Sequence, residues 1–480
     1  MTGPATASSP PRVMSVPASR WREEVERALG DGLRFRCAYA TGADGRSWSA
    51  LFGDGPEALL LRTSLPLGGS TVASIVDLVE AADWDEREAH DLAGIAFEGR
   101  PSTRPLADHS QPASAWTVPV SGAGVNQVAV GPIHAGVIES GHFRFHVVGE
   151  RILHLDLRLF YGHRGLERAA VGAEPGLGIA YAQRACGACA VTNSVAYAQA
   201  CEVMLGLGVD ERTRRERTLL LELERLHNHL HDIAAICAGV GFAAGNMAFA
   251  NLKERVLTVN RELSGHRFLF GSIAVGRGGI AATGARLEPL RTALTELSVD
   301  VAAAWRALDF ATTLQARLAD TGSLSRERAV QLGTVGPAAR ASGVERDVRC
   351  DSPGLAYSGF SPARIERPTG DCSARLRIRA IELGATFEIL DELLGVGLGA
   401  ASGPRGAGSE LSLGVGSVEG PRGESVCVVE GNGASVRRLH LRTASYANWP
   451  SLALACGGEL LPDFPLINKS FELCYACTDR

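Results

Sequence analysis

Lysine and excess basic charge are both nearly missing from this 480-residue sequence. Only Lys253 and Lys469 are lysines among 48 basic residues, and the formal net charge is −5. Proteins that bind nucleic acid through its phosphates present a broad basic face, so the sequence predicts no nucleic-acid partner. In a chain that uses arginine nearly everywhere, Lys469 is notable because it lies close to the last two cysteines. Plain chance explains that position equally well.

The sequence also lacks a secretory signal and a charge-free apolar run long enough to cross a membrane. Residues 1–20 are rich in Pro, Ser and Ala and have no apolar core, which predicts a disordered lead-in. The most apolar stretch, residues 233–252, contains two asparagines and many small residues, so it predicts a buried helix pair or helix–loop. Eleven cysteines without a secretory context indicate a reducing compartment, where thiols serve as metal ligands or core residues.

Changes in composition along the chain predict two domains. Residues 21–110 mix short strands with helices, which indicates a small α+β domain. A stretch rich in Ser, Pro and Ala follows, and we place a linker at residues 111–125. Residues 126–480 then form the second and larger domain.

Periodicity predicts the elements of the larger domain. Polar and apolar residues alternate over residues 143–161, which predicts a β-hairpin. Apolar residues recur with helical spacing, most clearly over residues 212–237 and 373–394. The expected fold class is α+β, with a mainly helical second domain and a peripheral β-hairpin or sheet.

Two Cys-x-x-Cys motifs carry the clearest chemical signal, Cys186-Gly-Ala-Cys189 and Cys474-Tyr-Ala-Cys477. The two-residue spacer lets both sulfurs face one metal ion, and four thiols would suit zinc, an iron–sulfur cluster or another soft metal. Zinc ribbons usually space their pairs by ~15–20 residues, whereas these pairs lie mid-chain and at the very end. A single site would therefore tie a central turn to the C-terminal segment. On spacing alone, structural zinc and two unrelated pairs both remain open.

The stretches around these cysteines resemble the large catalytic subunit of [NiFe]-hydrogenases, of the complex I-related, membrane-associated type (group 4) found in formate hydrogenlyase. The N-terminal "EREAHDLAGIAFEGRP" is similar to the signature of the small, 30-kDa-type complex I subunit that this type often carries fused in front. The resemblance runs in order over roughly residues 20–480. The other matching stretches are "GPIHAGVIESGHFRF", "RLFYGHRGLERA", "RACGACAVTNSVAYAQACE", "ERLHNHL", "GPAARASGVERDVRCDSP", "VEGPRGES" and "RTASYANWPSL" with "DFPLINKSFELCYACTDR".

This resemblance implies a nickel–iron centre whose iron carries carbon monoxide and cyanide. Cys186 and Cys474 match the terminal nickel thiolates, and Cys189 and Cys477 match the thiolates that bridge nickel and iron. Soft thiolates suit such a metal pair and exclude hard ions.

The resemblance also assigns two catalytic residues. Glu167, in Arg-Gly-Leu-Glu, matches the family's proton-relay carboxylate. Arg422, in Glu-Gly-Pro-Arg-Gly, matches the arginine that lies over the metals as a fixed donor. Arg405 repeats only Pro-Arg-Gly, and we interpret it as part of a loop.

The implied activity is interconversion of H2 with protons and electrons within a multi-subunit complex. The implied partners are an iron–sulfur small subunit with its own [4Fe–4S] cluster, membrane-embedded complex I-like subunits and a formate dehydrogenase module. The implied location is the cytoplasmic face of the cell membrane. Two alternatives remain: a complex I-like quinone-oxidoreductase subunit without nickel, linked to quinone and NAD, and a non-enzymatic docking subunit with structural zinc.

Several histidines near the motifs have weaker assignments. His227 and His231 lie one turn apart beside Glu224, a spacing that can bind metal. The matching helix of the family is structural or part of a proton path, and we prefer that interpretation. His134 and His163 lie in matching loops, without a defined role.

The chain departs from the family pattern at a few positions. Asn193 stands where a histidine usually tunes a bridging sulfur; an asparagine can donate a hydrogen bond but cannot titrate. Ala188 and Ala476 replace bulkier or polar residues, and Pro353-Gly354-Leu355 replaces a Pro-Tyr segment. None of these changes removes a metal ligand.

The end of the sequence raises a further expectation. Many relatives carry a C-terminal tail that is cut off after metal insertion, at a point matching the end of Arg480. Because this sequence starts at Met1 and stops at Arg480, we expect that no such cleavage is needed.

Overall fold

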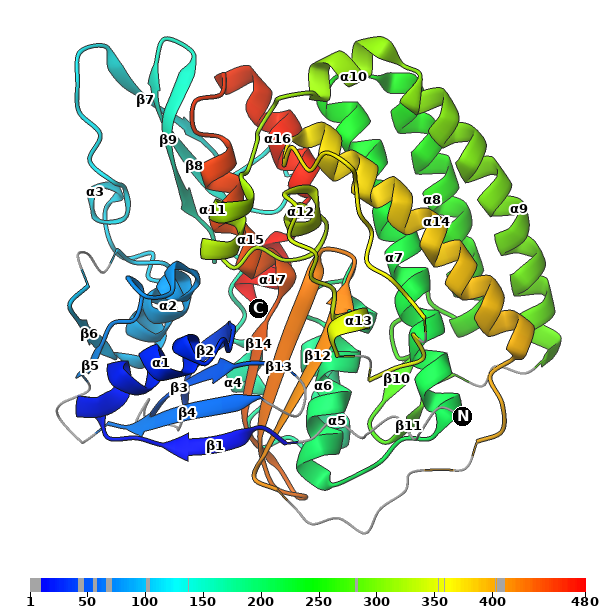
Figure 1. Cartoon of the computed structure of the whole chain (residues 1–480), viewed down its shortest axis with the longest axis horizontal. Helices are drawn as coiled ribbons and strands as arrows, with labels where there is room; N and C mark the ends of the chain where they lie inside the picture. Colours follow the sequence, from blue (N-terminus) through cyan, green and yellow to red (C-terminus); the bar gives the residue numbers. More distant parts are fainter. Residues whose placement is uncertain are drawn as a thin grey trace.

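The structure is a computed structural model of the chain. It describes residues 10–41, 47–54, 58–65, 71–100, 104–136, 138–280, 284–352, 354–357, 359–401, 403 and 411–480. Helices and small sheets both contribute (Figure 1), which confirms the α+β class predicted from the sequence. Pro353, Arg405 and the first nine residues lie outside this part of the chain.

A unit built on a four-stranded sheet forms the N-terminal part of the molecule (Figure 1). The strand order is β1-β4-β3-β2, with β1 parallel to β4 and the other pairs antiparallel. Trp21 and Val25 of the first helix share one apolar core with Trp48 and Phe52 of the sheet. The elements are β1 (Arg12–Ser15), η1 (Ala18–Arg20), α1 (Trp21–Gly30), β2 (Phe35–Thr41), β3 (Ser47–Phe52), β4 (Leu59–Ser64), β5 (Thr71–Ala73), η3 (Glu80–Ala82), α2 (Asp83–Ala93) and β6 (Ala96–Glu98).

The prediction of a disordered lead-in is wrong for its second half. Residues 12–15 form β1, which pairs with residues 59–62 of β4, and Val16 behind it is buried. A sheet edge offers unpaired N–H and C=O groups to any extended segment. Backbone pairing does not depend on the side chains, so a Pro/Ser-rich composition does not exclude it.

A second sheet confirms the predicted hairpin. β8 (His142–Val148) and β9 (Arg151–Arg158) pair antiparallel across Gly149 and Glu150, and β7 (Val125–Val130) adds a third strand. Phe143, Phe145 and Ile152 bury their side chains in the main core of the larger domain. The predicted linker contains the short helix α3 (Ala113–Trp116), whose Trp116 is buried.

Long helices make up most of the larger domain. α7 (Glu211–Gly239), α8 (Ala243–Ser264), α9 (Gly284–Asp309) and α14 (Cys372–Val396) lie side by side (Figure 1). The stretch 233–252 therefore forms the predicted helix pair, the end of α7 and the start of α8. The shorter elements are α4 (Leu166–Ala169), α5 (Pro175–Gln183), β10 (Ile273–Ala274), β11 (Arg277–Gly278), α10 (Thr312–Leu318), α11 (Arg326–Gln331), α12 (Gly336–Ala341) and α13 (Val348–Asp351).

A central sheet supports the helix that follows the first cysteine pair. β12 (Leu413–Gly420), β13 (Gly423–Gly431) and β14 (Val436–Arg442) form this antiparallel sheet, and α6 (Ala190–Leu205) packs on β12. The approach is so close that a Cβ on Gly416 would lie 2.0 Å from the Ala196 carbonyl oxygen. Glycine at this position is thus a packing requirement.

The C-terminal segment returns to the middle of the molecule (Figure 1). It consists of α15 (Ala444–Ala455), η4 (Leu461–Asp463), α16 (Phe464–Phe471) and α17 (Tyr475–Asp479). Residues 477–480 are all buried.

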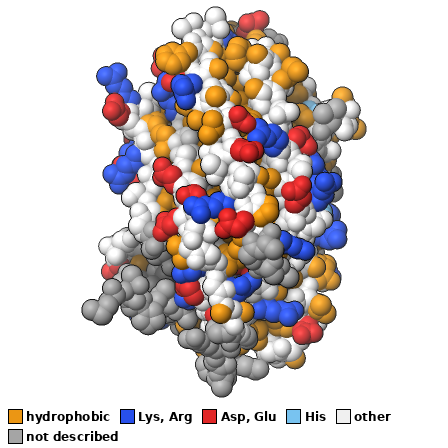
Figure 2. Space-filling view, turned by 90° about the vertical axis from the view of Figure 1, so that its right-hand side faces the viewer, with side chains coloured by type: hydrophobic (Ala, Val, Ile, Leu, Met, Phe, Trp, Pro, Cys, Tyr) orange, Lys and Arg blue, Asp and Glu red, His pale blue; other side chains and the backbone are white. Residues whose placement is uncertain are grey.

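None of the described helices is long and apolar enough to cross a membrane. Figure 2 views the molecule from the right-hand side of Figure 1 and shows acidic and basic side chains interspersed with apolar ones.

Candidate metal centre

The first Cys-x-x-Cys pair lies in the turn between α5 and α6. Cys189 is the N-cap residue of α6, and Cys186 precedes it by one turn. The carboxylate of Glu224 on α7 accepts hydrogen bonds from the backbone N–H groups of Val191 at 2.7 Å and Thr192 at 3.0 Å. A carboxylate at a helix N-terminus satisfies otherwise unpaired donors, so α7 fixes the orientation of the turn that carries both thiols.

The second pair lies at the start of α17. Cys474 is its N-cap residue, and the Cys474 sulfur accepts the N–H of Cys477 at 3.3 Å. Two residues at the start of α15 hold the segment: the Ser445 hydroxyl accepts the Cys474 N–H at 3.0 Å, and the Thr443 hydroxyl donates to the Cys477 carbonyl at 3.0 Å.

The fold brings the two pairs together. The sulfurs of Cys186 and Cys474 are 3.1 Å apart, and those of Cys186, Cys189 and Cys477 lie within 4.8 Å of one another. Hydrogen bonds from the three neighbouring thiols lower the pKa of Cys186 well below its usual range. Four converging, mostly buried sulfurs form a donor set that fits a soft metal ion.

Arg422, in the turn from β12 to β13, points its guanidinium at this cluster. Its Nη1 lies 3.8 Å from the Cys189 sulfur and donates to the Asn228 side-chain oxygen at 2.7 Å, while Nη2 lies 3.4 Å from a carboxylate oxygen of Asp232. Burial would lower the pKa of Arg422, but Asp232 and the cysteines outweigh that effect and raise it. The side chain is thus a fixed cation beside the sulfurs.

Sequence reasoning named Glu224 but not the other two residues of the α7 face that lies against the site. The residues that contact the site are Glu224, Asn228 and Asp232, spaced by four and therefore on one side of the helix. Asn228 links both halves, because its amide donates to the Ala188 carbonyl at 2.8 Å while its oxygen accepts from Arg422. Their spacing of four residues is the sequence pattern that could have predicted this polar face of α7.

His227 and His231 of α7 do not converge on a metal position. His227 is buried against the ring of Phe268, and burial lowers its pKa to about 3, so it is neutral. His231 is half exposed and lies 3.4 Å from Glu472. This arrangement agrees with the structural interpretation.

Glu167 lies in an ion-pair cluster at the domain boundary. It accepts the Leu441 N–H at 2.9 Å and pairs with Arg480 at 2.9 Å and Arg438 at 3.0 Å. Burial would raise the pKa of Glu167, but Arg480, His440 and Arg438 together lower it well below its usual range. The carboxylate is therefore held ionised.

Glu139 is a carboxylate near the cluster that sequence reasoning missed. It lies in the loop before β8, and its Oε2 accepts the N–H of Ala476, between the two cysteines of the second motif, at 2.9 Å. Partial burial, together with the nearby Cys186, raises its pKa. The sequence could not predict this contact, because Glu139 and Ala476 lie far apart in the chain and only folding brings them together.

Asn193 gives an independent sign that a group belongs beside the sulfurs. It lies one turn after Cys189 on α6 and is fully buried, yet neither its Nδ2 nor its Oδ1 has a hydrogen-bond partner among the described residues. An unpaired buried amide costs about 1–3 kcal/mol. A bound group with hydrogen-bonding atoms would remove that cost, so the site fits a metal with polar ligands.

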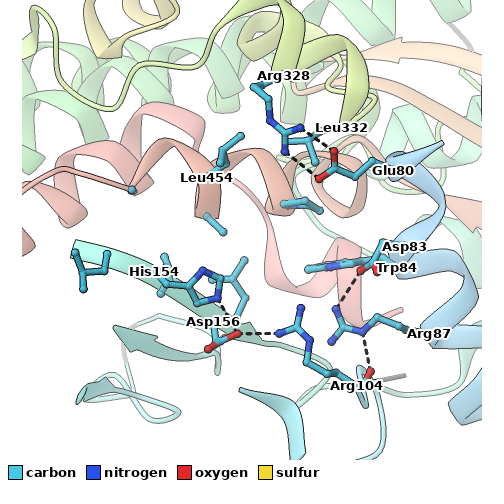
Figure 3. A pocket seen from close by; sticks show the side chains of 16 residues that line it. Glu80, Asp83, Trp84, Arg87, Arg104, His154, Asp156, Arg328, Leu332 and Leu454 are labelled. Atoms are coloured by element: carbon cyan, nitrogen blue, oxygen red, sulfur yellow. Dashed lines mark hydrogen bonds and ion pairs between the residues drawn. The ribbon is translucent and has the colours of Figure 1, made fainter. Parts of the chain in front are cut away.

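A separate cleft of about 260 Å³ lies between α2, β9 and α15 (Figure 3). Its acidic residues are matched by arginines: Arg328 with Glu80 at 2.9 Å, Arg87 with Asp83 at 3.3 Å, and Arg104 with Asp156 at 2.9 Å. The Arg328–Glu80 and Arg104–Asp156 pairs connect the N-terminal unit with the helical domain and the hairpin, whereas the Arg87–Asp83 pair lies within α2. Together the three pairs leave little unbalanced charge for a ligand.

Comparison with known proteins identifies the family. Residues 239–396 and 410–480 match the family of the respiratory-chain NADH dehydrogenase 49 Kd subunit, and residues 28–115 match that of the 30 Kd subunit. Formate hydrogenlyase subunit 5 of Escherichia coli is 32% identical over 459 residues, covering 85% of this chain and 76% of that protein. The chain belongs to the complex I-related hydrogenase large subunits.

Two further similarities agree with this family. Hydrogenase-4 component G of Escherichia coli is 30% identical over 452 residues, covering 85% of this chain and 75% of that protein. The solved structure of the membrane-bound sulfane sulfur reductase, an archaeal respiratory membrane complex, matches with a TM-score of 0.68 and 25% identity, covering 74% of this chain and 99% of that one. This chain joins a 30 Kd-like part and a 49 Kd-like part in one polypeptide. The N-terminal signature predicted this fusion.

Proposed function

We propose that this chain is the catalytic subunit of a formate hydrogenlyase-type [NiFe]-hydrogenase, which interconverts H2 with protons and electrons and passes the electrons to a partner iron–sulfur subunit. The observation that carries the proposal is the convergence of the two distant Cys-x-x-Cys pairs, with 3.1 Å between the sulfurs of Cys186 and Cys474. The family assignment supports it, because one relative is a hydrogenase component by name and another is a formate hydrogenlyase subunit.

In this proposal the four thiolates hold the metals. Cys186, Cys189, Cys474 and Cys477 would hold nickel and iron through their sulfurs. When bound, the nickel–iron centre, with carbon monoxide and cyanide on iron, supplies heterolytic cleavage of H2. Arg422 contributes a fixed positive charge, because Asn228 and Asp232 anchor its guanidinium next to the Cys189 sulfur.

Proton transfer needs a carboxylate that can gain and lose a proton near neutral pH. Glu167 is the residue that the resemblance assigns to this step, but Arg480 and Arg438, together with His440, lower its pKa and hold it ionised. Glu139 combines a raised pKa with a contact to the second cysteine motif and a position that reaches solvent. We therefore favour Glu139 as the group that takes up and releases the proton.

The proposed partners follow from the family. They are an iron–sulfur small subunit carrying a [4Fe–4S] cluster, membrane-embedded complex I-like subunits and a formate dehydrogenase module. The chain would lie on the cytoplasmic face of the cell membrane through these partners. The named relatives support the membrane complex, since the solved structure is that of a respiratory membrane complex.

Metal analysis tests the proposal against its alternatives. The chain is purified together with its partners, and we expect nickel and iron in equal amounts with infrared bands from metal-bound carbon monoxide and cyanide. Zinc alone would favour the structural docking subunit. Absence of metal would favour a nickel-free complex I-like subunit linked to quinone and NAD. Either of these two results would refute the hydrogenase proposal.

A further inference from the structure

The side chain of Arg480 is enclosed between the N-terminal unit and the larger domain. It is only 2% exposed, although it belongs to the segment that directly follows Cys477. Its Nη1 pairs with Glu167 of α4 at 2.9 Å, and its Nη2 pairs with Glu88 of α2. One guanidinium thus connects two carboxylates that come from different domains.

The remaining donors and the flat face of Arg480 are also used. Nη1 donates to the Leu441 carbonyl at 2.8 Å and Nε to the Thr478 carbonyl at 3.3 Å. The guanidinium carbon lies 4.7 Å from the centre of the Tyr446 ring. A guanidinium has five donors in a rigid planar fork. The oxygens around Arg480 accept from the edge of this group, and the Tyr446 ring lies against its flat face.

The backbone beside Arg480 is fastened as well. The Asp479 carboxylate accepts the N–H groups of Phe160 and Gly162, both at 2.7 Å, and the Arg480 carbonyl accepts the N–H of Arg164 at 3.0 Å. These contacts lie between the larger domain and the segment itself. Among the contacts of Arg480 and Asp479 named here, the pair with Glu88 is the one that reaches the described part of the N-terminal unit.

Glu88 depends on this contact more than Glu167 does. Glu167 has Arg438 and His440 beside it in addition to Arg480, whereas Arg480 is the ion-pair partner of Glu88 within the described part of the chain. Removing one partner of a buried ion pair leaves an uncompensated charge and is strongly destabilising. The pair therefore couples the position of α2 to that of the segment.

We infer that Glu88 and Glu167 form a two-carboxylate receptor for Arg480, through which the N-terminal unit holds the Cys474–Cys477 segment closed over the cysteine cluster. Glu88 acts through Arg480 and is a positioning residue. The inference deepens the proposed function, because this segment carries two of the four thiols, but its test requires no metal.

The test measures how quickly the thiols react in the metal-free, full-length protein. Iodoacetamide labelling of Cys474 and Cys477 is followed by peptide mass spectrometry, with the partly buried Cys350 as an internal reference for general loosening. In Glu88→Gln we expect both segment cysteines to label at least tenfold faster while Cys350 is unchanged. Glu23→Gln is the matched control, because Glu23 lies in the same unit with 59% of its side chain exposed and pairs with its near neighbours Arg20 and Arg27.

Two further variants distinguish a specific receptor from general stability. Glu88→Asp keeps the charge and should restore at least part of the protection. Glu88→Gln combined with Arg480→Gln should label no faster than Arg480→Gln alone, since residues that act through one contact are not additive. Wild-type labelling rates in Glu88→Gln, or equal acceleration of Cys350, would overturn the inference. If the labelling results are as expected but the protein binds no nickel, the proposed function is refuted and this inference is still supported.

Discussion

At the residue scale, Cys477 is the most deeply buried of the cluster thiols, at 1% exposure. Replacing it with serine exchanges a soft thiolate for a hard hydroxyl of similar size, which does not bridge soft metals. We expect Cys477→Ser to abolish H2-dependent dye reduction while the complex still assembles. Dye reduction and size-exclusion profiles of the purified complex check both parts. Cys350→Ser, outside the cluster, should keep full activity; retained activity in Cys477→Ser would refute the ligand assignment.

Two carboxylates compete for the proton-transfer role, and paired variants separate them. Glu139→Gln keeps the size of the side chain but cannot carry a proton, so we expect dye reduction to fall by about 10²–10⁴-fold with unchanged nickel content. Glu167→Gln removes a counterion of Arg480 and should lower nickel content and activity together. Activity and metal content are measured on the same preparations. Full activity in Glu139→Gln, with loss at normal nickel content in Glu167→Gln, would return the role to Glu167.

The sequence predicted the cysteines because their spacing is a local property, but it could not predict their surroundings. Glu139 stands in a quoted matching stretch, yet only folding places it against Ala476. The same holds for Asn228, whose two contacts lie on separate segments. His227, by contrast, has a strong local pattern and turns out to be a neutral core residue. The local pattern was enough to select the candidate cysteines, whereas only the tertiary contacts show which residues surround them.

At the element scale, the contact between α6 and β12 supports the first cysteine pair. We expect Gly416→Ala to lower the free energy of unfolding by about 1–3 kcal/mol, because the added methyl meets the Ala196 backbone. Gly384→Ala is the matched control: Gly384 lies inside α14 with open space around its Cβ position. That change should stabilise the helix by roughly 0.8–1 kcal/mol. Thermal unfolding of the metal-free protein measures both, and equal signs for the two variants would contradict the packing argument.

The elements divide clearly into those that periodicity predicts and those that it does not. α7, α14 and the β8–β9 hairpin follow from long or alternating apolar patterns. β1 does not, because its pairing to β4 is made by backbone groups. The central sheet does not follow from periodicity either, since its glycines serve contact with α6 rather than strand formation.

At the scale of the whole molecule, buried arginines join the two domains. Arg36 of β2 and the preceding Arg34 both pair with Glu424 of β13, at 2.5 Å and 2.8 Å. Arg442 of β14 lies 3.4 Å from Asp85 of α2 and donates to the Arg36 carbonyl at 3.0 Å. Together with the contact between Arg480 and Glu88, these pairs make the N-terminal unit part of the frame around the cysteine cluster.

The Glu424 cluster predicts how this frame responds to acid. Burial would raise the pKa of Glu424, but Arg34 and Arg36 outweigh it and lower the pKa below its value in the unfolded chain, about 4.3. The cluster therefore contributes its full stability above that value and loses it as the pH falls toward the lower, folded-state pKa. Glu424→Gln removes the titrating group and, by breaking a buried pair, should cost about 3–5 kcal/mol at pH 7.

The measurement is the melting temperature of the metal-free protein between pH 8 and pH 3.5. We expect wild type to melt well above Glu424→Gln at neutral pH and the difference to shrink once the pH falls below about 4.3. Glu23→Gln, which removes an exposed surface carboxylate, should track wild type throughout. A difference that stays constant down to pH 3.5 would mean that Glu424 is not held ionised by the arginines of the N-terminal unit. A difference that shrinks as expected would show that charge pairing across the domain boundary stabilises the frame in which the four cysteines meet.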